Sequence, residues 1–181
     1  GYTGEDGVEL YAPADQAEKL WDLVLETGKD DGLIPCGLGA RDTLRMEAAM
    51  PLYGHEMNDD VTPLETGLNF AVKMKKDDFI GKSAMEEAGA PTIKRVGLKV
   101  TGRGIIREEQ TIYVEDASAP DGRKEIGHTT SGTHCPFLGE PVGMGLIDKE
   151  YAEVGNKLIV DVRGRMVEVE IVPLPFYTRA K

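Results

Sequence analysis

The sequence predicts an α+β protein in which a helix-containing first half is followed by a small antiparallel barrel or sandwich. Three observations lead to this fold class. An amphipathic stretch follows Pro13, the turn-forming segment 89–91 interrupts the chain midway, and six short stretches of alternating apolar residues come after it. We therefore expect one domain over residues 1–90 and a second over residues 91–181.

The first elements lie between Glu9 and Gly28. A short strand is expected over Glu9–Ala12, followed by a helix near Asp15, which forms a capping-box pattern with Glu18. Gly28 is typical of the residue that follows a helix. The face of this helix that we expect to be buried has the spacing i, i+3, i+4, i+7, i+8 and consists of Ala17, Leu20, Trp21, Val24 and Leu25.

Three further elements complete the predicted first half. Apolar residues that recur every four positions indicate a helix from about Leu38 to Ala49. Pro51 is expected to end this helix. A strand is expected around Asn69–Met74, and a short helix around Lys82–Ala88.

The second half alternates apolar and polar residues with period two. Gly, Asp and Pro clusters separate six predicted strands, which is typical of a small barrel or sandwich. The last two strands flank Arg163-Gly164 and form a plausible hairpin. The predicted strands are Arg95–Thr101, Thr111–Asp116, Glu125–Thr130, Val142–Ile147, Leu158–Arg163 and Met166–Val172.

Composition narrows the class of protein. The net charge of −11 argues against non-specific binding to nucleic acid or to anionic membranes. No apolar run approaches the roughly 20 residues that span a bilayer, and no signal-peptide pattern opens the chain. The two cysteines, Cys36 and Cys135, indicate neither a disulfide framework nor a zinc ribbon. We expect a soluble protein of a reducing, cytoplasmic compartment, or of the mitochondrial matrix in a eukaryotic source.

The opening segment, Gly1 to Glu9, combines glycines, carboxylates and one Tyr. Its general interpretation is a surface turn. A more specific one is a pterin site, because the carboxylate of Glu9 can accept two N–H bonds from a 2-amino-pyrimidinone edge while the ring of Tyr2 covers the flat heterocycle.

Arginine recurs once per turn in the second predicted helix. Arg41 and Arg45 share the face next to the apolar one, where they either contact an anionic ligand or pair within the helix. The Asp42–Arg45 spacing of i, i+3 fits an ordinary surface pair.

Three other features have a simpler explanation. A run of five basic residues without an intervening acid indicates a solvated strand face, with docking of an anionic partner as the alternative. The run is Lys94, Arg95, Lys99, Arg103 and Arg107.

A metal site is not expected at His128, His134 and Cys135, because they have no fourth ligand at a recognised spacing. Ser131 lacks the context of a catalytic nucleophile and is expected in a turn.

Four blocks in order resemble one family, that of the glycine cleavage T-protein and its folate-binding relatives. They are GYTGEDGVE from Gly1, GLGARDTLRMEAAMPLYG from Gly37, TPLETGLNFAVKMKKDDFIGKSA from Thr62, and TTSGT with PVGMGLI between Thr129 and Ile147. The resemblance implies the C-terminal part of a folate-binding α+β domain followed by a small antiparallel β-barrel domain.

The resemblance also implies an activity and a site. The family's aminomethyltransferases move an aminomethyl group from the dihydrolipoyl arm of H-protein to tetrahydrofolate and release ammonia. Carried over residue by residue, Glu9 matches the pterin-binding carboxylate, Tyr2 its aromatic neighbour and Arg41 the folate-contacting arginine. Tyr177, in the terminal Pro175-Phe176-Tyr177, matches a further folate contact. The implied ligands and partners are tetrahydrofolate and lipoylated H-protein, without a metal.

Two departures accompany the match. His134-Cys135 stands where the family usually has an aromatic residue followed by serine. The chain also begins at Gly1 without Met, and the family's catalytic aspartate lies in an N-terminal region that precedes it. We therefore expect a fragment with no transferase activity of its own.

Two alternatives stay open at this point. One is another folate enzyme of the superfamily, such as a demethylase or the folate half of a dimethylglycine or sarcosine dehydrogenase. The other is a non-enzymatic folate-binding protein that keeps the fold. Tyr2, Glu9 and Arg41 favour folate binding in each case.

Overall fold

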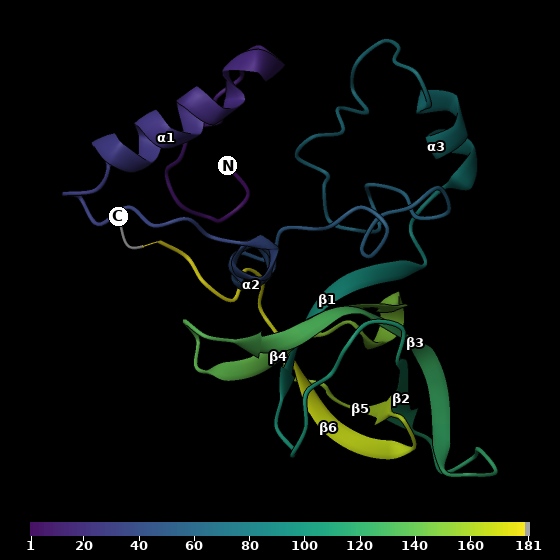
Figure 1. The fold of residues 1–181 in the computed structure, drawn as a ribbon. Helices are drawn as coiled ribbons and strands as arrows, with labels where there is room; N and C mark the ends of the chain where they lie inside the picture. Colours follow the sequence, from purple (N-terminus) through teal and green to yellow (C-terminus); the bar gives the residue numbers. More distant parts are fainter. Residues whose placement is uncertain (180–181) are drawn as a thin grey trace.

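The computed structural model describes residues 1–179 and consists of a helical part above a six-stranded barrel (Figure 1). The helices are α1 (Ala17–Thr27), α2 (Leu38–Glu47) and α3 (Lys82–Ala88). Short 3-10 turns occupy Ala14–Gln16 and Lys149–Tyr151. The strands are β1 (Ile93–Val100), β2 (Thr111–Glu115), β3 (Arg123–Cys135), β4 (Glu140–Asp148), β5 (Lys157–Val162) and β6 (Arg165–Val172).

The second half closes into a barrel rather than a sandwich. The strands follow the order β1-β4-β3-β2-β5-β6, every neighbouring pair is antiparallel, and β6 returns to pair with β1. The predicted hairpin is confirmed: Val162 pairs with Arg165, and Arg163 and Gly164 have the positive φ values of 57° and 83° that such a two-residue turn needs. The predicted α+β class with an antiparallel barrel is correct.

Alternating apolar side chains fill the barrel. Along β5 and β6, Leu158 and Val160 face Val167, Val169 and Ile171, all at most 2% exposed. Closure leaves no free sheet edge, so the short strands pair along both sides.

A second apolar cluster attaches α2 to the outside of the barrel. Met46 in the last turn of α2 and Ala49 just after the helix pack with Cys135, Val142 and Met144 of β3 and β4. The C-terminal tail covers β1 beside this cluster, where a Cβ on Gly97 would lie 2.5 Å from Cδ2 of Leu174. This packing sets the orientation of α2 relative to β3.

Several sequence-based expectations in the first half are wrong in detail. Helix α1 forms where predicted, but none of its residues is buried, and its N-cap residue Gln16 makes no side-chain capping bond. The expected strands at Glu9–Ala12 and Asn69–Met74 are irregular segments. Alternation alone does not make a strand stable, because its backbone groups need a neighbouring strand to pair with.

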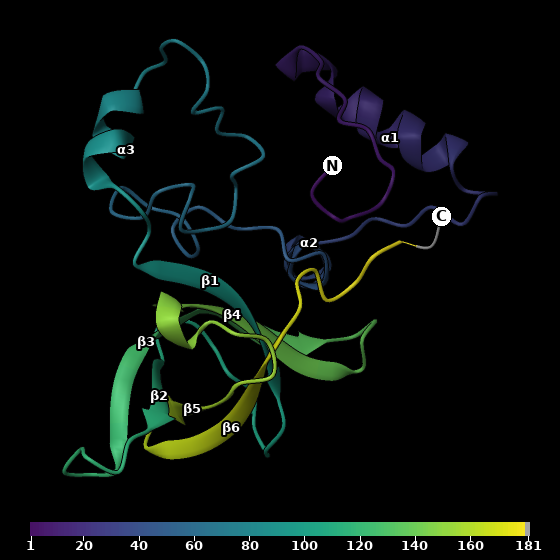
Figure 2. The ribbon, with the colours of Figure 1, turned by 180° about the vertical axis from the view of Figure 1, so that it is seen from behind.

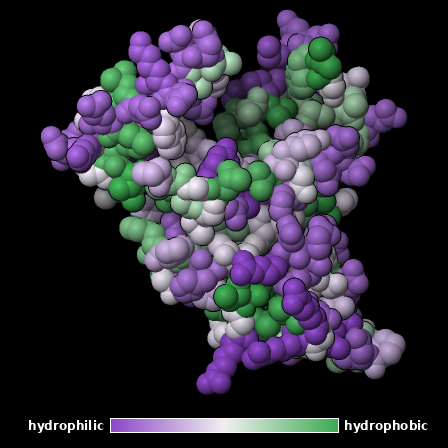
Figure 3. Space-filling view, in the orientation of Figure 1, coloured by the Kyte–Doolittle hydropathy of each residue, from purple (hydrophilic) through white to green (hydrophobic). Residues whose placement is uncertain are grey.

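The helical part is open above α2. Helices α1 and α3 lie on opposite sides of the molecule in both ribbon views (Figures 1 and 2). The space-filling view shows a hollow between these two sides (Figure 3). Within residues 1–179, no helix combines the length and the apolar character needed to cross a membrane.

Candidate functional site

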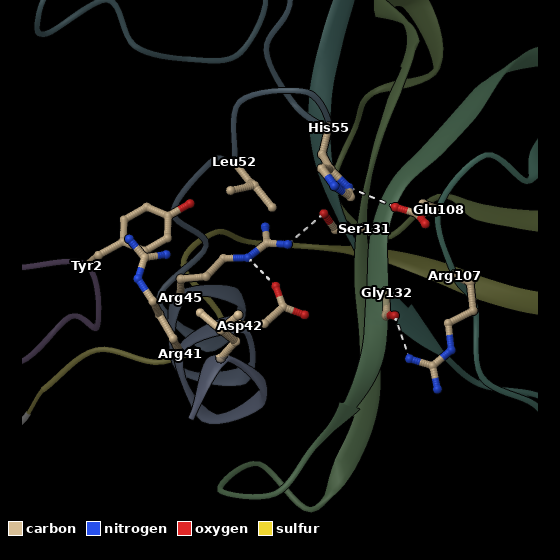
Figure 4. Close-up of a pocket in the computed structure, with 11 residues that line it drawn as sticks. Tyr2, Arg41, Asp42, Arg45, Leu52, His55, Arg107, Glu108, Ser131 and Gly132 are labelled. Atoms are coloured by element: carbon tan, nitrogen blue, oxygen red, sulfur yellow. Dashed lines mark hydrogen bonds and ion pairs between the residues drawn. The ribbon is translucent and has the colours of Figure 1, made fainter. Parts of the chain in front are cut away.

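A cavity of about 420 Å³ lies where the N-terminal segment, α2 and the barrel meet (Figure 4). Both halves of the chain contribute to its wall. The first half supplies Tyr2, Leu38, Arg41, Asp42, Arg45, Leu52 and His55, and the barrel part supplies Arg107, Glu108, Ser131 and Gly132. Residues more than 100 positions apart in the sequence therefore share one cavity.

Tyr2 and Arg41 form one side of the cavity. The Tyr2 hydroxyl donates to the carbonyl oxygen of Pro51 at 2.6 Å, and the guanidinium carbon of Arg41 lies 4.4 Å from the centre of the Tyr2 ring. Burial raises the pKa of the Tyr2 hydroxyl, which the positive charge of Arg45 partly counteracts. Among residues 1–179, no acidic side chain lies within ion-pair distance of Arg41, so its N–H donors are available to an anion.

Arg45 is buried at the back of the cavity in a polar network. Its Nε donates to Oδ1 of Asp42 at 2.8 Å, and its Nη1 pairs with Oε2 of Glu56 at 3.1 Å. Glu56 is 0% exposed and also accepts from the backbone N–H of Leu52 at 2.9 Å and from the hydroxyl of Thr130 at 2.6 Å. The network ties α2 and the 50–57 loop to strand β3, and so holds the cavity wall together.

His55 and Glu108 form the opposite rim. The Nδ1 of His55 lies 3.0 Å from Oε2 of Glu108 and 3.0 Å from the carbonyl oxygen of Thr130. Next to Glu108, Arg107 donates to the carbonyl oxygen of Gly132 at 3.2 Å and to the Thr133 hydroxyl at 3.0 Å. These contacts join the segment between β1 and β2 to the outer surface of β3.

The structure brings together two of the four predicted site residues. Tyr2 and Arg41 line the cavity side by side, whereas Glu9 and Tyr177 are not among its lining residues in the described chain. Glu9 is exposed and accepts a hydrogen bond from the Tyr11 hydroxyl at 2.7 Å. Tyr177 donates its hydroxyl proton to Glu5, and this bond raises the pKa of Tyr177.

The predicted basic run does not form a single surface. Arg95 points inward, where its Nη1 donates to the carbonyl oxygen of Ala49 at 2.8 Å and desolvation lowers its pKa. Lys99 pairs with Glu140 at 2.6 Å, and Arg107 lines the cavity. Lys94 and Arg103 are exposed.

The expectation that Ser131 lies in a turn is wrong, because Ser131 lies in strand β3.

Sequence reasoning missed much of the cavity wall. Arg45 had a weak signal, because it lies one helical turn after Arg41. His55 and Glu108 had none, and neither had Glu56, which is buried behind the wall. Each gains its role from a partner distant in the sequence or in another element.

Comparisons with known proteins find related sequences for both halves of the chain. Residues 1–76 match the family described as "GCVT N-terminal domain", and residues 94–178 match "Glycine cleavage T-protein C-terminal barrel domain". A protein named aminomethyltransferase from Bacillus cereus (strain ZK / E33L) is 47% identical over 185 residues, which is 100% of this chain and 48% of that protein. One of the same name from Bacillus mycoides (strain KBAB4) is 46% identical over 184 residues, with the same coverage of 100% and 48%.

A solved structure shows the same arrangement. The glycine cleavage system aminomethyltransferase T from Bartonella henselae superposes with a TM-score of 0.86 at 34% identity, and the match covers 98% of this chain and 48% of that one. The chain thus spans about half the length of the relatives that it matches.

Proposed function

The chain belongs to the glycine cleavage T-protein family, and on that premise we propose that it forms a folate-binding part of an aminomethyltransferase. In the proposed reaction, the aminomethyl carbon on the dihydrolipoyl arm of H-protein passes to tetrahydrofolate, and ammonia is released. Residues 1–90 are assigned to the folate-binding domain and residues 91–181 to the barrel domain. The observation that carries the proposal is the cavity that Tyr2 lines together with Arg41 and Arg45, with Arg41 over the Tyr2 ring.

The chemistry of the wall suits a folate. An aromatic ring beside the cavity can pack against a flat pterin, and an arginine without an acidic partner can hold a glutamate carboxylate with two parallel hydrogen bonds. Three arginines and two carboxylates line the cavity in a chain whose net charge is −11. Arg45 is paired with acidic side chains. Arg41 and Arg107 have no ion-pair partner within residues 1–179, so their positive charge favours an anionic ligand at this place.

Glu9 and Tyr177 keep their proposed roles as folate contacts. Glu9 lies on the same N-terminal segment as Tyr2, and Tyr177 is hydrogen-bonded to Glu5 of that segment. In the proposal, the Glu9 carboxylate orients the pterin edge, because a carboxylate accepts two N–H bonds from it.

Positioning is the proposed contribution of these residues to catalysis. Transfer of a one-carbon unit requires the pterin nitrogen to be held close to the lipoyl-bound carbon, and a fixed geometry can supply a large part of the rate. We assign no catalytic acid within these 181 residues. The partner proposal, lipoylated H-protein, and the cytoplasmic location rest on the family and on its bacterial members.

Calorimetric titration with tetrahydrofolate or its 5-formyl analogue tests folate binding. Arg41→Ala should weaken the affinity by roughly 10- to 100-fold, the usual effect of losing a charged hydrogen bond. Arg103→Ala removes the same charge from an exposed position outside the cavity and serves as the control. Equal affinity in both variants would rule out the role of Arg41, and no saturable binding by the parent protein would rule out the folate site.

Turnover is a separate test. With aminomethylated H-protein and tetrahydrofolate, a polypeptide of these 181 residues should release no ammonia above the uncatalysed rate, because no acid is assigned to assist the leaving amine. Measurable release of ammonia together with methylenetetrahydrofolate would contradict this part of the proposal.

A further inference from the structure

We propose that Ser131 of the barrel is a ligand-binding residue, whose hydroxyl donates a hydrogen bond to a carbonyl or carboxylate oxygen of the ligand in the cavity. The identity of the ligand rests on the proposed function. The role of Ser131 rests on three features of the described residues: the irregular pairing of β3, the hydrogen bonds of two neighbouring hydroxyls, and the rigid support behind them.

The first feature is a bulge in β3. Thr129 pairs with Gly145 of β4, and Ser131 pairs with the next residue, Met144, so Thr130 is an extra residue in the ladder. Successive side chains of a regular strand point to opposite faces, and a bulge changes the direction in which a side chain points. Here the side chains of Thr130 and Ser131 both reach the Arg45–Glu56 pair.

The second feature is the difference between these two hydroxyls. A serine or threonine hydroxyl has one proton to donate and can also accept hydrogen bonds. The Thr130 hydroxyl donates its proton to Oε1 of Glu56 at 2.6 Å. The Ser131 hydroxyl instead accepts from Nη2 of Arg45 at 2.9 Å, and an arginine cannot accept a proton in return.

The Ser131 proton therefore has no acceptor among residues 1–179. Ser131 is 3% exposed, and a buried hydroxyl without an acceptor is unfavourable. Because Ser131 lines the cavity, a ligand oxygen placed there satisfies this donor (Figure 4). Thr130 is 1% exposed and is not among the lining residues, so it is the matched position without this function.

The third feature is the support behind Ser131. Arg45 is held by Asp42 at 2.8 Å and by Glu56 at 3.1 Å, which fixes the guanidinium that contacts the serine. With one lone pair of Oγ engaged by Arg45, the hydroxyl has few orientations left for its proton. A donor fixed before the ligand arrives loses little entropy on binding.

The test compares Ser131→Ala with Thr130→Val in calorimetric titrations with 5-formyl-tetrahydrofolate. Each variant removes one buried hydroxyl from the same bulge, and thermal unfolding reports the structural effect of both. Ser131→Ala should weaken the affinity about three- to tenfold, the usual effect of one hydrogen bond. Thr130→Val should lower the melting temperature but change the affinity less than about twofold.

Ser131→Cys is a second variant for the case in which the alanine variant folds poorly. It keeps a side chain of similar shape but has a weak donor, so it should also bind more weakly than the parent. Unchanged affinity in a folded Ser131→Ala or Ser131→Cys variant would overturn the inference, as would an equal loss in Thr130→Val. A parent protein that binds no folate would overturn the proposed function and this inference together. The two failures are therefore distinguishable, because loss of the inference alone requires a parent protein that binds folate.

Discussion

Arg41 and Arg45 lie one helical turn apart and carry the same charge, yet α2 places them in different surroundings. Arg41 is exposed over the Tyr2 ring, whereas Arg45 is 2% exposed and paired with Glu56. The first is free to meet an anion, and the second holds the wall in place. Such a buried pair is sensitive to loss of one partner, since the remaining charge is left without compensation.

Glu56→Gln should therefore lower the free energy of unfolding by about 3–5 kcal/mol. The substitution keeps the shape of the side chain but removes the buried carboxylate that faces Arg45, and leaves the half-exposed Asp42 as its ion-pair partner. Urea denaturation measures the change, with Glu86→Gln as the control because Glu86 is exposed and its pair with Lys82 on α3 contributes less than about 1 kcal/mol. Equal effects of the two substitutions would contradict the assigned importance of the network.

A second residue-scale prediction concerns pH. Burial, together with the nearby Glu47 carboxylate, raises the pKa of the Cys135 thiol from 9.0 to about 12. Below pH 9 the thiol is protonated in both states; between pH 9 and 12 the unfolded chain loses the proton while the native state keeps it. Deprotonation of Cys135 in the unfolded chain should therefore lower the free energy of unfolding by about 1.4 kcal/mol for each pH unit above the unfolded pKa.

Comparing the parent with Cys135→Ala isolates this effect, because the other titrating groups are common to both proteins. Unfolding free energies at pH 8, 9, 10 and 10.5 should converge as the pH rises, since only the parent has the thiol contribution. A difference between the two proteins that stays constant with pH would show that the native thiol titrates normally.

At the scale of elements, α2 and β4 use glycine for different reasons. Gly39 lies inside α2 with no atom within 4 Å of the position that a Cβ would take. Gly143 lies in β4, where a Cβ would be 2.6 Å from Cδ1 of Ile106 and from the carbonyl oxygen of Ser131. Because Gly143 has no side chain, β4 can approach the bulge in β3 and the Ile106 side chain closely.

The two glycines should consequently respond in opposite directions to alanine. Gly39→Ala should stabilise the protein by about 0.5–1 kcal/mol, the gain in helix preference over glycine. Gly143→Ala should destabilise it by about 1–3 kcal/mol through overpacking. Denaturation midpoints of both variants test the pair, and a stabilised Gly143→Ala protein would show that the barrel can absorb the methyl group.

At the scale of the whole molecule, the C-terminal tail joins parts that are distant in the sequence. Leu174 and Phe176 pack against the cluster between α2 and the barrel, and the Tyr177 N–H donates to the carbonyl oxygen of Glu47 at 2.8 Å. Beyond this point, Tyr177 contacts Glu5 and Arg179 pairs with Asp6. The tail thus connects the barrel, α2 and the N-terminal segment that carries Tyr2.

A chain ending at Pro173 should keep the barrel but lose protection of α2 and of residues 1–9. Hydrogen exchange should become faster in these segments while the amides of β1–β6 stay protected, because the barrel strands pair independently of the tail. Tyr177→Phe, which removes only the bond to Glu5, is the control and should affect residues 1–9 alone. Uniformly faster exchange throughout the barrel would contradict this division.

The sequence by itself determined the elements whose signals are local. Period two with glycine-rich turns was enough to predict six strands and the Arg163-Gly164 hairpin, and helical spacing was enough for α1 and α2. The four family blocks identified Tyr2 and Arg41, which do meet in one cavity. These features depend on neighbouring residues or on blocks of contiguous sequence, which can be read without knowing the fold.

Only the tertiary structure decided which polar groups are buried and what they contact. Glu56 pairs with Arg45 and Thr130, 11 and 74 positions away, and the bulge that directs Ser131 to the same place is a property of the β3–β4 register. The apolar face of α1 is not buried for the same kind of reason, because amphipathic spacing tells which side of a helix is apolar but not what covers it. Burial and pairing depend on the distances between segments. The tertiary packing sets these distances, and the local sequence does not contain them.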